Sequence, residues 1–160
     1  MRIGRHGIPF DCFKFRTMVS DAEDLLKAWE HENPALYEEY TRTFKLKDDP
    51  RITPIGRWLR KTSLDELPQL WNVLRGDMSL VGPRPVVAEE LEEHYGPGTQ
   101  LYIRTRPGIT GLWQVSGRSD TSYERRVILD EWYILNWSFW YDIVILIQTA
   151  WIVVTGKGAV

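Results

Sequence analysis

The sequence has few of the residues that build disulfides, zinc sites and nucleic-acid-binding surfaces. Its 160 residues include one cysteine, Cys12, and three histidines in unrelated contexts. An internal disulfide is therefore excluded, and a zinc site is not expected. A lone cysteine suits a reducing compartment such as the cytosol. The formal net charge of −2 lacks the strong basic excess of domains that coat nucleic acid, which argues against nucleic acid as a partner.

The sequence also lacks an apolar run long enough to span a membrane. The run over residues 143–154 has 12 residues, is interrupted by Gln148 and Thr149, and has Asp142 before it. A spanning helix needs about 20 apolar residues. Aromatic residues crowd around this run, as they do at a membrane–water interface: Trp132, Tyr133, Trp137, Phe139, Trp140, Tyr141 and Trp151. Two placements remain open, a helix lying in the membrane interface and a helix buried in the core. The polar, basic N-terminus does not resemble a signal peptide.

The remaining patterns predict one α+β domain over residues 1–160, compact and mostly α-helical. A strand and a glycine-rich turn at residues 2–9, followed by alternation over residues 10–18, predict a short N-terminal β-hairpin. In the second strand, Lys14 and Arg16 would share one face, opposite Phe13 and Phe15. Amphipathic helices that can lie at an interface follow, including one over residues 85–96.

Residues 20–45 form an acidic segment that predicts a helical insert. A capping-box signal at Ser20 predicts one helix to about Glu32, and the break at Pro34 predicts a second helix to about Thr43. We expect a solvated helical hairpin, and its residues indicate no chemistry.

Two adjacent carboxylates, Asp65 and Glu66, lie in a helix-start signal. Ser63 and Glu66 fit a capping box. Pro68 either interrupts the helix, where it removes a donor, or occupies the first helical position. Either start leaves both carboxylates near the first turn, where the helix dipole favours their ionised form. The apolar stripe that follows is expected to face the core: Leu67, Leu70, Trp71 and Leu74.

The simplest role of such a pair is helix capping, but the basic residues around it favour a chemical role as well. The segment from residue 51 to residue 63 holds four basic side chains and no acidic one: Arg51, Arg57, Arg60 and Lys61. Arg84 is held between two prolines, which suits bidentate recognition of phosphate. Beside such cations, an ionised Asp65 could be a nucleophile and an ionised Glu66 a metal ligand.

A glycine-rich stretch over residues 101–118 adds three arginines and no acidic residue. Its glycines allow backbone N–H groups to approach a phosphate, and Arg104, Arg106 and Arg118 supply charge. Ordinary turn chemistry explains the glycines equally well, so the stretch alone does not predict a phosphate site.

Four segments together resemble the bacterial sugar transferase family, the monotopic phosphoglycosyl transferases: KFRTM, DPRIT, LRKTSLDELPQLWNVLRGDMSLVGPRP and RPGITGLWQVSGR. With the insert, the resemblance covers nearly the whole chain, and its long central segment is highly specific. The insert and the NWSFWYDI segment are most similar to catalytic domains of the undecaprenyl-phosphate galactose phosphotransferase type.

The resemblance implies transfer of a sugar 1-phosphate, galactose 1-phosphate in particular, from a UDP-sugar to undecaprenyl phosphate. It implies that Asp65 is the nucleophile, that a phosphosugar becomes linked to it, and that UMP is released. Glu66, with Asp65, would bind Mg²⁺, a hard cation that takes carboxylate and phosphate oxygens. The residues implied in binding substrate phosphates are Lys14, Arg16, Arg60, Arg84, Arg106 and Arg118.

The family resemblance also implies a place in the cell, the cytoplasmic face of the bacterial inner membrane. Family members carry a hydrophobic re-entrant helix before the region that matches RIGRHG, and this sequence has none. We therefore expect a truncated form or a late start, peripheral to the membrane, with doubtful activity on a lipid. The alternatives are a catalytically silent module that binds a nucleotide sugar or a protein, and a soluble phosphotransferase. A homo-oligomer is left open.

Overall fold

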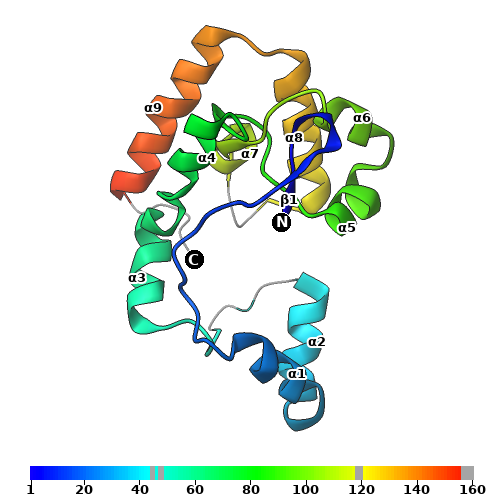
Figure 1. The fold of residues 1–160 in the computed structure, drawn as a ribbon, viewed down its shortest axis with the longest axis vertical. Coiled ribbons are helices and arrows are strands. Elements are labelled where there is room, and N and C mark those ends of the chain that lie inside the picture. Colours follow the sequence, from blue (N-terminus) through cyan, green and yellow to red (C-terminus); the bar gives the residue numbers. More distant parts are fainter. Residues whose placement is uncertain (44–45, 47–48, 118–120, 156–160) are drawn as a thin grey trace.

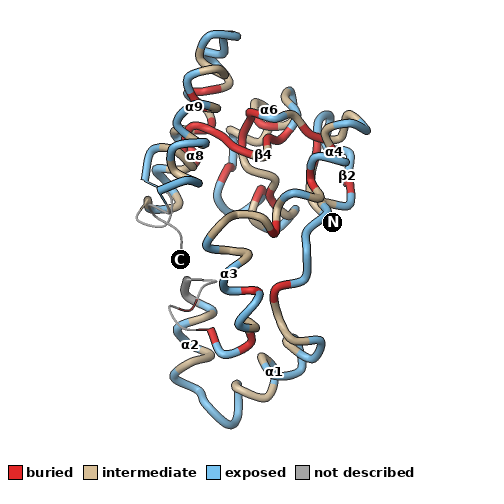
Figure 2. Tube along the Cα trace, turned by 90° about the vertical axis from the view of Figure 1, so that its left-hand side faces the viewer, coloured by how far each residue is buried: buried red, intermediate tan, exposed pale blue. Residues whose placement is uncertain are grey.

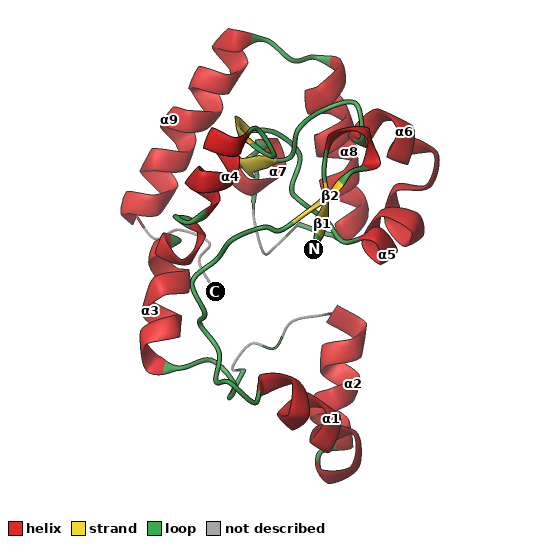
Figure 3. Cartoon of the chain, in the orientation of Figure 1, coloured by secondary structure: helices red, strands yellow, loops and turns green. Residues whose placement is uncertain are grey.

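Helices surround two small β-sheets in this protein (Figures 1 and 3). The structure is a computed structural model that describes residues 1–43, 46, 49–117 and 121–155. The strands are β1 (Arg2–Ile3), β2 (Pro9–Phe10), β3 (Ser79–Val81) and β4 (Gly108–Thr110). The α-helices are α1 (Ala22–Glu32), α2 (Pro34–Thr43), α3 (Pro54–Thr62), α4 (Gln69–Arg75), α5 (Ala88–Glu90), α6 (Thr99–Tyr102), α7 (Leu112–Val115), α8 (Tyr123–Leu135) and α9 (Phe139–Thr155). Short 3₁₀ turns occupy η1 (Arg5–Gly7), η2 (Leu64–Glu66) and η4 (Gly96–Gly98), and η3 (Leu91–Tyr95) is a π-helix. The predicted mostly helical α+β fold is confirmed.

The N-terminal hairpin forms as expected but is shorter than the sequence pattern indicates. Strands β1 and β2 pair antiparallel, with Arg2 opposite Phe10. The predicted second strand over residues 10–18 is wrong beyond Phe10, apart from one isolated bridge at Met18. The reason lies in its backbone donors: Phe13 N–H bonds to a side chain of α4, and Phe15 N–H bonds to the carbonyl of Asp65. This segment is therefore tied to η2 and α4 in place of a partner strand.

The second sheet is a parallel pair that the sequence did not predict. Strands β3 and β4 pair with Ser79 opposite Gly108. The backbone directly after β3 also packs closely on β4, since a Cβ on Gly108 would lie 2.2 Å from the backbone nitrogen of Gly82. Only glycine fits such an approach. The contact fixes the start of the loop that carries Arg84.

The two helices of the insert, α1 and α2, match the predicted pair and lie together at the bottom of Figure 1. Arg51 anchors them. Its guanidinium lies 5.1 Å from the ring centre of Trp29 and 4.8 Å from that of Tyr40. Asp49 pairs with the same guanidinium at 2.7 Å, and both charged side chains are nearly inaccessible. Burial of a paired charge between aromatic rings explains why the insert is held against the segment before α3.

The chain turns sharply between α3 and α4. Thr53 caps α3 by accepting from Gly56 N–H, and Ser63 ends α3 in the left-handed conformation at φ 57°. The predicted capping box at Ser63 is wrong, because the Ser63 side chain makes no capping bond and Glu66 pairs elsewhere. Helix α4 begins directly after Pro68, close to the second of the two predicted starts.

The apolar stripe of α4 does not face the core, contrary to the prediction. Leu67, Leu70, Trp71 and Leu74 are 45–79% exposed. The buried side chains of this helix are Gln69 and Asn72. Asn72 is buried where an apolar side chain was expected, because its amide forms hydrogen bonds with backbone groups of the segment before Lys14. The helix therefore presents its apolar face outward.

The apolar core has two parts, both crossed by α8. Figure 2 shows most of the buried segments in the upper half of the molecule, with a few in the lower half near α3 and the insert. The first contains Val86, Leu91, Tyr95, Tyr102 and Val127. The second contains Val81, Leu112, Tyr133 and Ile145. Ser122 caps helix α8, because its hydroxyl accepts a hydrogen bond from Arg125 N–H.

Helix α9 lies largely exposed, so the apolar run is not buried in the core, and its placement in a membrane interface stays a prediction. Ile145 is its one buried residue. Large apolar side chains along it stay exposed: Phe139, Trp140, Val144, Ile147, Trp151, Val153 and Val154. Among the residues that the structure describes, no helix is both long and apolar enough to cross a membrane.

Candidate active site

The turn η2 holds Asp65 with its side chain largely buried, at 9% exposure. Burial raises the pKa of Asp65, and the neighbouring Glu66 carboxylate raises it further, against the opposing charges of Lys14 and Arg60. The sequence argument that a helix dipole favours the ionised form does not hold here. A short 3₁₀ turn offers little dipole, and desolvation has the larger effect. The site contains a carboxylate more basic than an exposed aspartate.

Lys14 covers the acidic pair from the segment after β2. Its Nζ lies 2.6 Å from Oε1 of Glu66, with both side chains partly exposed. An ion pair of this exposure adds little to stability. Its effect is on position, because it places an ammonium group beside two carboxylates. The Asn72 amide fixes the segment that delivers Lys14, since it accepts from Phe13 N–H at 3.0 Å and donates to the Asp11 carbonyl at 2.7 Å.

Arg60 reaches the pair from α3. Its Nε donates to Oγ1 of buried Thr17 at 2.9 Å, and its charge lowers the pKa of Asp65. Helix α3 packs tightly against the same threonine, because a Cβ on Gly56 would lie 2.0 Å from the Thr17 carbonyl oxygen. The hydrogen bond to Thr17 thus ties the Arg60 guanidinium to the segment that follows Lys14.

Arg84 lies in the loop that follows β3. Its backbone carbonyl accepts from the Tyr102 hydroxyl at 2.9 Å, and its guanidinium lies 5.5 Å from the ring centre of Trp113. Burial raises the pKa of the Cys12 thiol, while the charges of Lys14, Arg2 and Arg84 lower it and that of Glu66 raises it. Charges from the N-terminal strand, the Lys14 segment, η2 and the loop after β3 thus act on one thiol.

The other predicted phosphate-binding residues are not brought to Asp65 by any contact in the described residues. Arg16 is exposed in the segment after Lys14. Arg106 is exposed, and its guanidinium lies near Gly76, at the end of α4 opposite to η2. A seven-residue helix is about 10 Å long, so Arg106 stands well away from the acidic pair. Arg118 lies outside the described residues.

The predicted Mg²⁺ site would have two protein carboxylates. No cluster of three or more His, Cys, Asp or Glu side chains suited to a metal occurs in the described residues. Asp65 and Glu66 fit a cation that binds through one or two carboxylates and completes its shell with phosphate oxygens and water. The mutual repulsion that raises the pKa of Asp65 is the repulsion that such a cation would offset.

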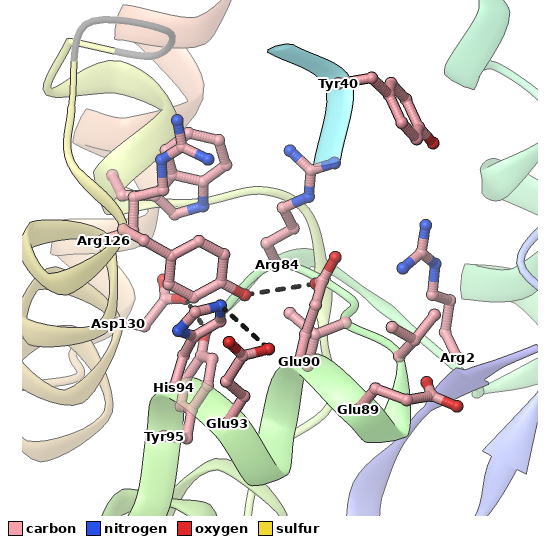
Figure 4. A pocket seen from close by; sticks show the side chains of 14 residues that line it. Arg2, Tyr40, Arg84, Glu89, Glu90, Glu93, His94, Tyr95, Arg126 and Asp130 are labelled. Carbon is pink, nitrogen blue, oxygen red and sulfur yellow. Dashed lines mark hydrogen bonds and ion pairs between the residues drawn. The ribbon is translucent and has the colours of Figure 1, made fainter. Parts of the chain in front are cut away.

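A pocket of about 410 Å³ adjoins this region at Arg84 and Arg2 (Figure 4). Besides these two arginines, its charged and aromatic lining comes from the α5–η3 segment, α7, α8 and α2: Glu89, Glu90, Glu93, His94, Tyr95, Trp113, Tyr123, Arg126, Asp130 and Tyr40. Sequence reasoning identified only Arg84 among them. The others are scattered over more than 120 residues of sequence, so no local pattern could have joined them. The one local feature of the sequence that could have pointed to this pocket is the pair of adjacent arginines, Arg125 and Arg126.

The site thus combines a largely buried carboxylate of raised pKa with cationic side chains around it. The sequence profile of the family described as "Bacterial sugar transferase" matches residues 1–156. The chain belongs to this family of transferases.

Three relatives illustrate the likeness. The chain is 55% identical to an undecaprenyl-phosphate galactose phosphotransferase of Salmonella typhimurium, and 55% identical to a UDP-galactose-lipid carrier transferase of Erwinia amylovora. Each match covers 99% of this chain and 33% of the relative. The exopolysaccharide production protein ExoY of Sinorhizobium fredii is 52% identical over 99% of this chain and 70% of its own length. The chain thus spans about a third of the length of the first two relatives.

Proposed function

We propose that this protein transfers a sugar 1-phosphate from a UDP-sugar to undecaprenyl phosphate through a phosphosugar linked to Asp65. The observation that carries the proposal is the desolvated Asp65 carboxylate, of raised pKa, beside the Glu66–Lys14 ion pair. Galactose is the sugar we propose, because the names of two relatives specify it. The product would begin an O-antigen, capsule or exopolysaccharide unit at the cytoplasmic face of the inner membrane.

In the first step, a carboxylate oxygen of Asp65 attacks the sugar-bearing phosphorus of the UDP-sugar. The bond from this phosphorus to the bridging oxygen breaks, and UMP leaves with the electron pair. A desolvated and therefore more basic carboxylate is the better nucleophile. Lys14 and Arg60, which flank Asp65, bring positive charge to the phosphate oxygens as the bond to the leaving group breaks.

In the second step, a phosphate oxygen of undecaprenyl phosphate attacks the same phosphorus. The bond to the aspartate oxygen breaks and regenerates the Asp65 carboxylate, so the product is the lipid diphosphate sugar. Both nucleophiles are anions, and neither step needs a general base. Mg²⁺ bound by Glu66 and Asp65 would supply Lewis acidity toward the diphosphate.

The lipid substrate requires contact with a membrane, and we propose that α9 provides part of it. Trp140, Trp151 and Val154 on this helix are 67–83% exposed. Large exposed apolar side chains of this density are unusual on a protein surrounded only by water. Tryptophan favours the level of lipid headgroups. The outward apolar face of α4, next to the η2 turn, would add to the same attraction.

Nucleotide exchange tests the chemistry without the lipid. The protein is incubated with Mg²⁺, UDP-galactose and labelled UMP, and label is expected in UDP-galactose because the first step is reversible. Asp65→Asn should abolish exchange, and Asp24→Asn, which changes a largely exposed carboxylate on α1, should leave it unchanged. Absence of exchange in a folded, vesicle-bound sample would disprove the covalent route. A panel of UDP-sugars in the same assay identifies the sugar.

Vesicle flotation tests the membrane contact. The protein should float with vesicles of anionic and zwitterionic lipid, and Trp140→Ser combined with Trp151→Ser should leave most of it in the soluble fraction. Leu25→Ser, at an exposed position on α1, should float like the unmodified protein. Equal flotation of the tryptophan double variant would mean that α9 does not make the contact.

A further inference from the structure

The pocket beside Arg84 holds two guanidinium groups at close range. Arg84 and Arg126 both lie over Trp113, at 5.5 and 4.8 Å from the ring centre. Burial lowers the pKa of Arg126, and the like charge of Arg84 lowers it further. In the described part of the chain, neither guanidinium is in an ion pair with a carboxylate. The Glu90 carboxylate acts on Arg126 from a longer range, and Arg126 Nε donates to the Thr121 carbonyl at 3.0 Å. Two guanidinium groups over one ring without a direct ion pair indicate a binding place for an anion, and guanidinium favours phosphate.

The opposite wall of the pocket is acidic. Glu89, Glu90 and Glu93 line it from α5 and η3, and Oε2 of Glu90 accepts from the Tyr123 hydroxyl at 3.3 Å. Figure 4 shows Glu90 rising from the α5 ribbon toward Arg84, with a dashed line at its hydrogen bond. Carboxylates are good acceptors for the hydroxyl groups of a ligand, and they are unfavourable neighbours for a hydrocarbon chain. The pocket therefore suits a ligand with a phosphate at one end and several hydroxyls at the other.

The pocket lies beside the N-terminal hairpin. Arg2 of β1 lines it, and Val86 in its wall accepts a hydrogen bond from Ile3 N–H at 2.9 Å. The segment that follows this hairpin carries Lys14, so the pocket and the acidic pair are joined through the same stretch of chain. The cavity volume of about 410 Å³ lies within the range of pockets that take small molecules.

We propose that this pocket binds the nucleoside monophosphate half of the nucleotide sugar, with its phosphate between Arg84 and Arg126 and its ribose hydroxyls on the glutamate wall. The assignment rests on the proposed function, since it places the leaving UMP. Arg126 and Glu90 become substrate-binding residues that the family motifs of the sequence do not include. Undecaprenyl phosphate is the other phosphate monoester of the reaction, and its hydrocarbon chain does not suit the acidic wall.

The affinity of the full chain for UMP, measured by calorimetry without Mg²⁺ or lipid, tests the assignment. Arg126→Gln should weaken UMP binding about tenfold to a hundredfold, the effect of losing a hydrogen-bonded charge on phosphate. Arg125→Gln changes an exposed arginine one residue away on α8 and should bind UMP like the unmodified protein. Uridine, which lacks the phosphate, should bind weakly to all three. Arg126→Lys keeps the charge and should recover part of the loss, and it serves as the second variant if Arg126→Gln unfolds.

Equal UMP affinities for the variants at positions 125 and 126 would overturn the assignment. A short-chain polyprenyl phosphate that displaces UMP from the unmodified protein, but not from Arg126→Gln, would also overturn it in favour of the lipid. Nucleotide exchange separates this result from the proposed function. Normal exchange with an unchanged KM for UMP in Arg126→Gln would support the covalent route and refute the assignment of the pocket to UMP. Loss of UMP binding in that variant, with no exchange in the unmodified protein, would support the assignment of the pocket to UMP and refute the covalent route.

Discussion

Asn72 offers a direct test of how the fold positions Lys14. Its side chain is fully buried on α4 and makes three hydrogen bonds: from Phe13 N–H at 3.0 Å, to the Asp11 carbonyl at 2.7 Å and to the Asp77 carboxylate at 3.3 Å. Asn72→Ala leaves two backbone groups without these partners, each at about 1–3 kcal/mol when buried. Since both groups are only partly buried, we expect a loss of about 2–4 kcal/mol in the free energy of unfolding.

Urea denaturation followed by circular dichroism measures this loss. Asn136→Ala is the matched control, because Asn136 is exposed and donates a single bond to the Trp132 carbonyl at 2.8 Å. We expect that variant to lose at most about 1 kcal/mol. Similar losses at the two positions would refute the reasoning, because they would mean that the Asn72 bonds do not hold the Lys14 segment against α4.

Three further changes test other parts of the structure. Gly56→Ala puts a methyl group 2.0 Å from the Thr17 carbonyl oxygen and should reduce stability by about 3 kcal/mol, measured by chemical denaturation. Burial raises the pKa of Asp130 to about 7, so its ionisation destabilises the folded state increasingly as pH rises from about 4 to 8. Asp130→Asn should therefore gain roughly 2–3 kcal/mol relative to the unmodified protein between pH 5 and pH 8, and parallel pH–stability curves would contradict this. Lys14→Gln removes the main charge that lowers the pKa of Asp65, so the acidic limb of the pH–rate profile for UMP exchange should move to higher pH. An unmoved limb would show that Lys14 does not act on Asp65.

The helices of the insert and α3 could be predicted because their signals are local. Pro34 and Pro54 stand at the starts of α2 and α3, where a missing N–H has no consequence. Thr53 caps its helix with a side chain three residues from the donor it satisfies. The α4 stripe could not be predicted in the same way. Its period is helical, but which face is buried depends on Asn72 and on a segment 60 residues earlier in the chain.

In the candidate site, too, residues with local signals could be predicted, and residues brought together by long-range contacts could not. Asp65, Glu66 and Arg60 lie within six residues of one another, and Lys14 and Arg84 lie in motifs of the family. Their proximity in the structure follows from long-range contacts that sequence spacing does not show. Arg126 has no motif, and only the folded chain brings it over the same indole ring as Arg84.

Intact-mass spectrometry of the covalent intermediate tests the central claim most directly. The protein, mixed with UDP-galactose and Mg²⁺ without lipid acceptor and quenched in acid, should gain the mass of one hexose phosphate. Peptide mapping should place that mass on Asp65, and Asp65→Asn should show no gain while still binding UMP. Adduct on another residue, or turnover by Asp65→Asn at the unmodified rate, would contradict the assignment of Asp65 as the nucleophile.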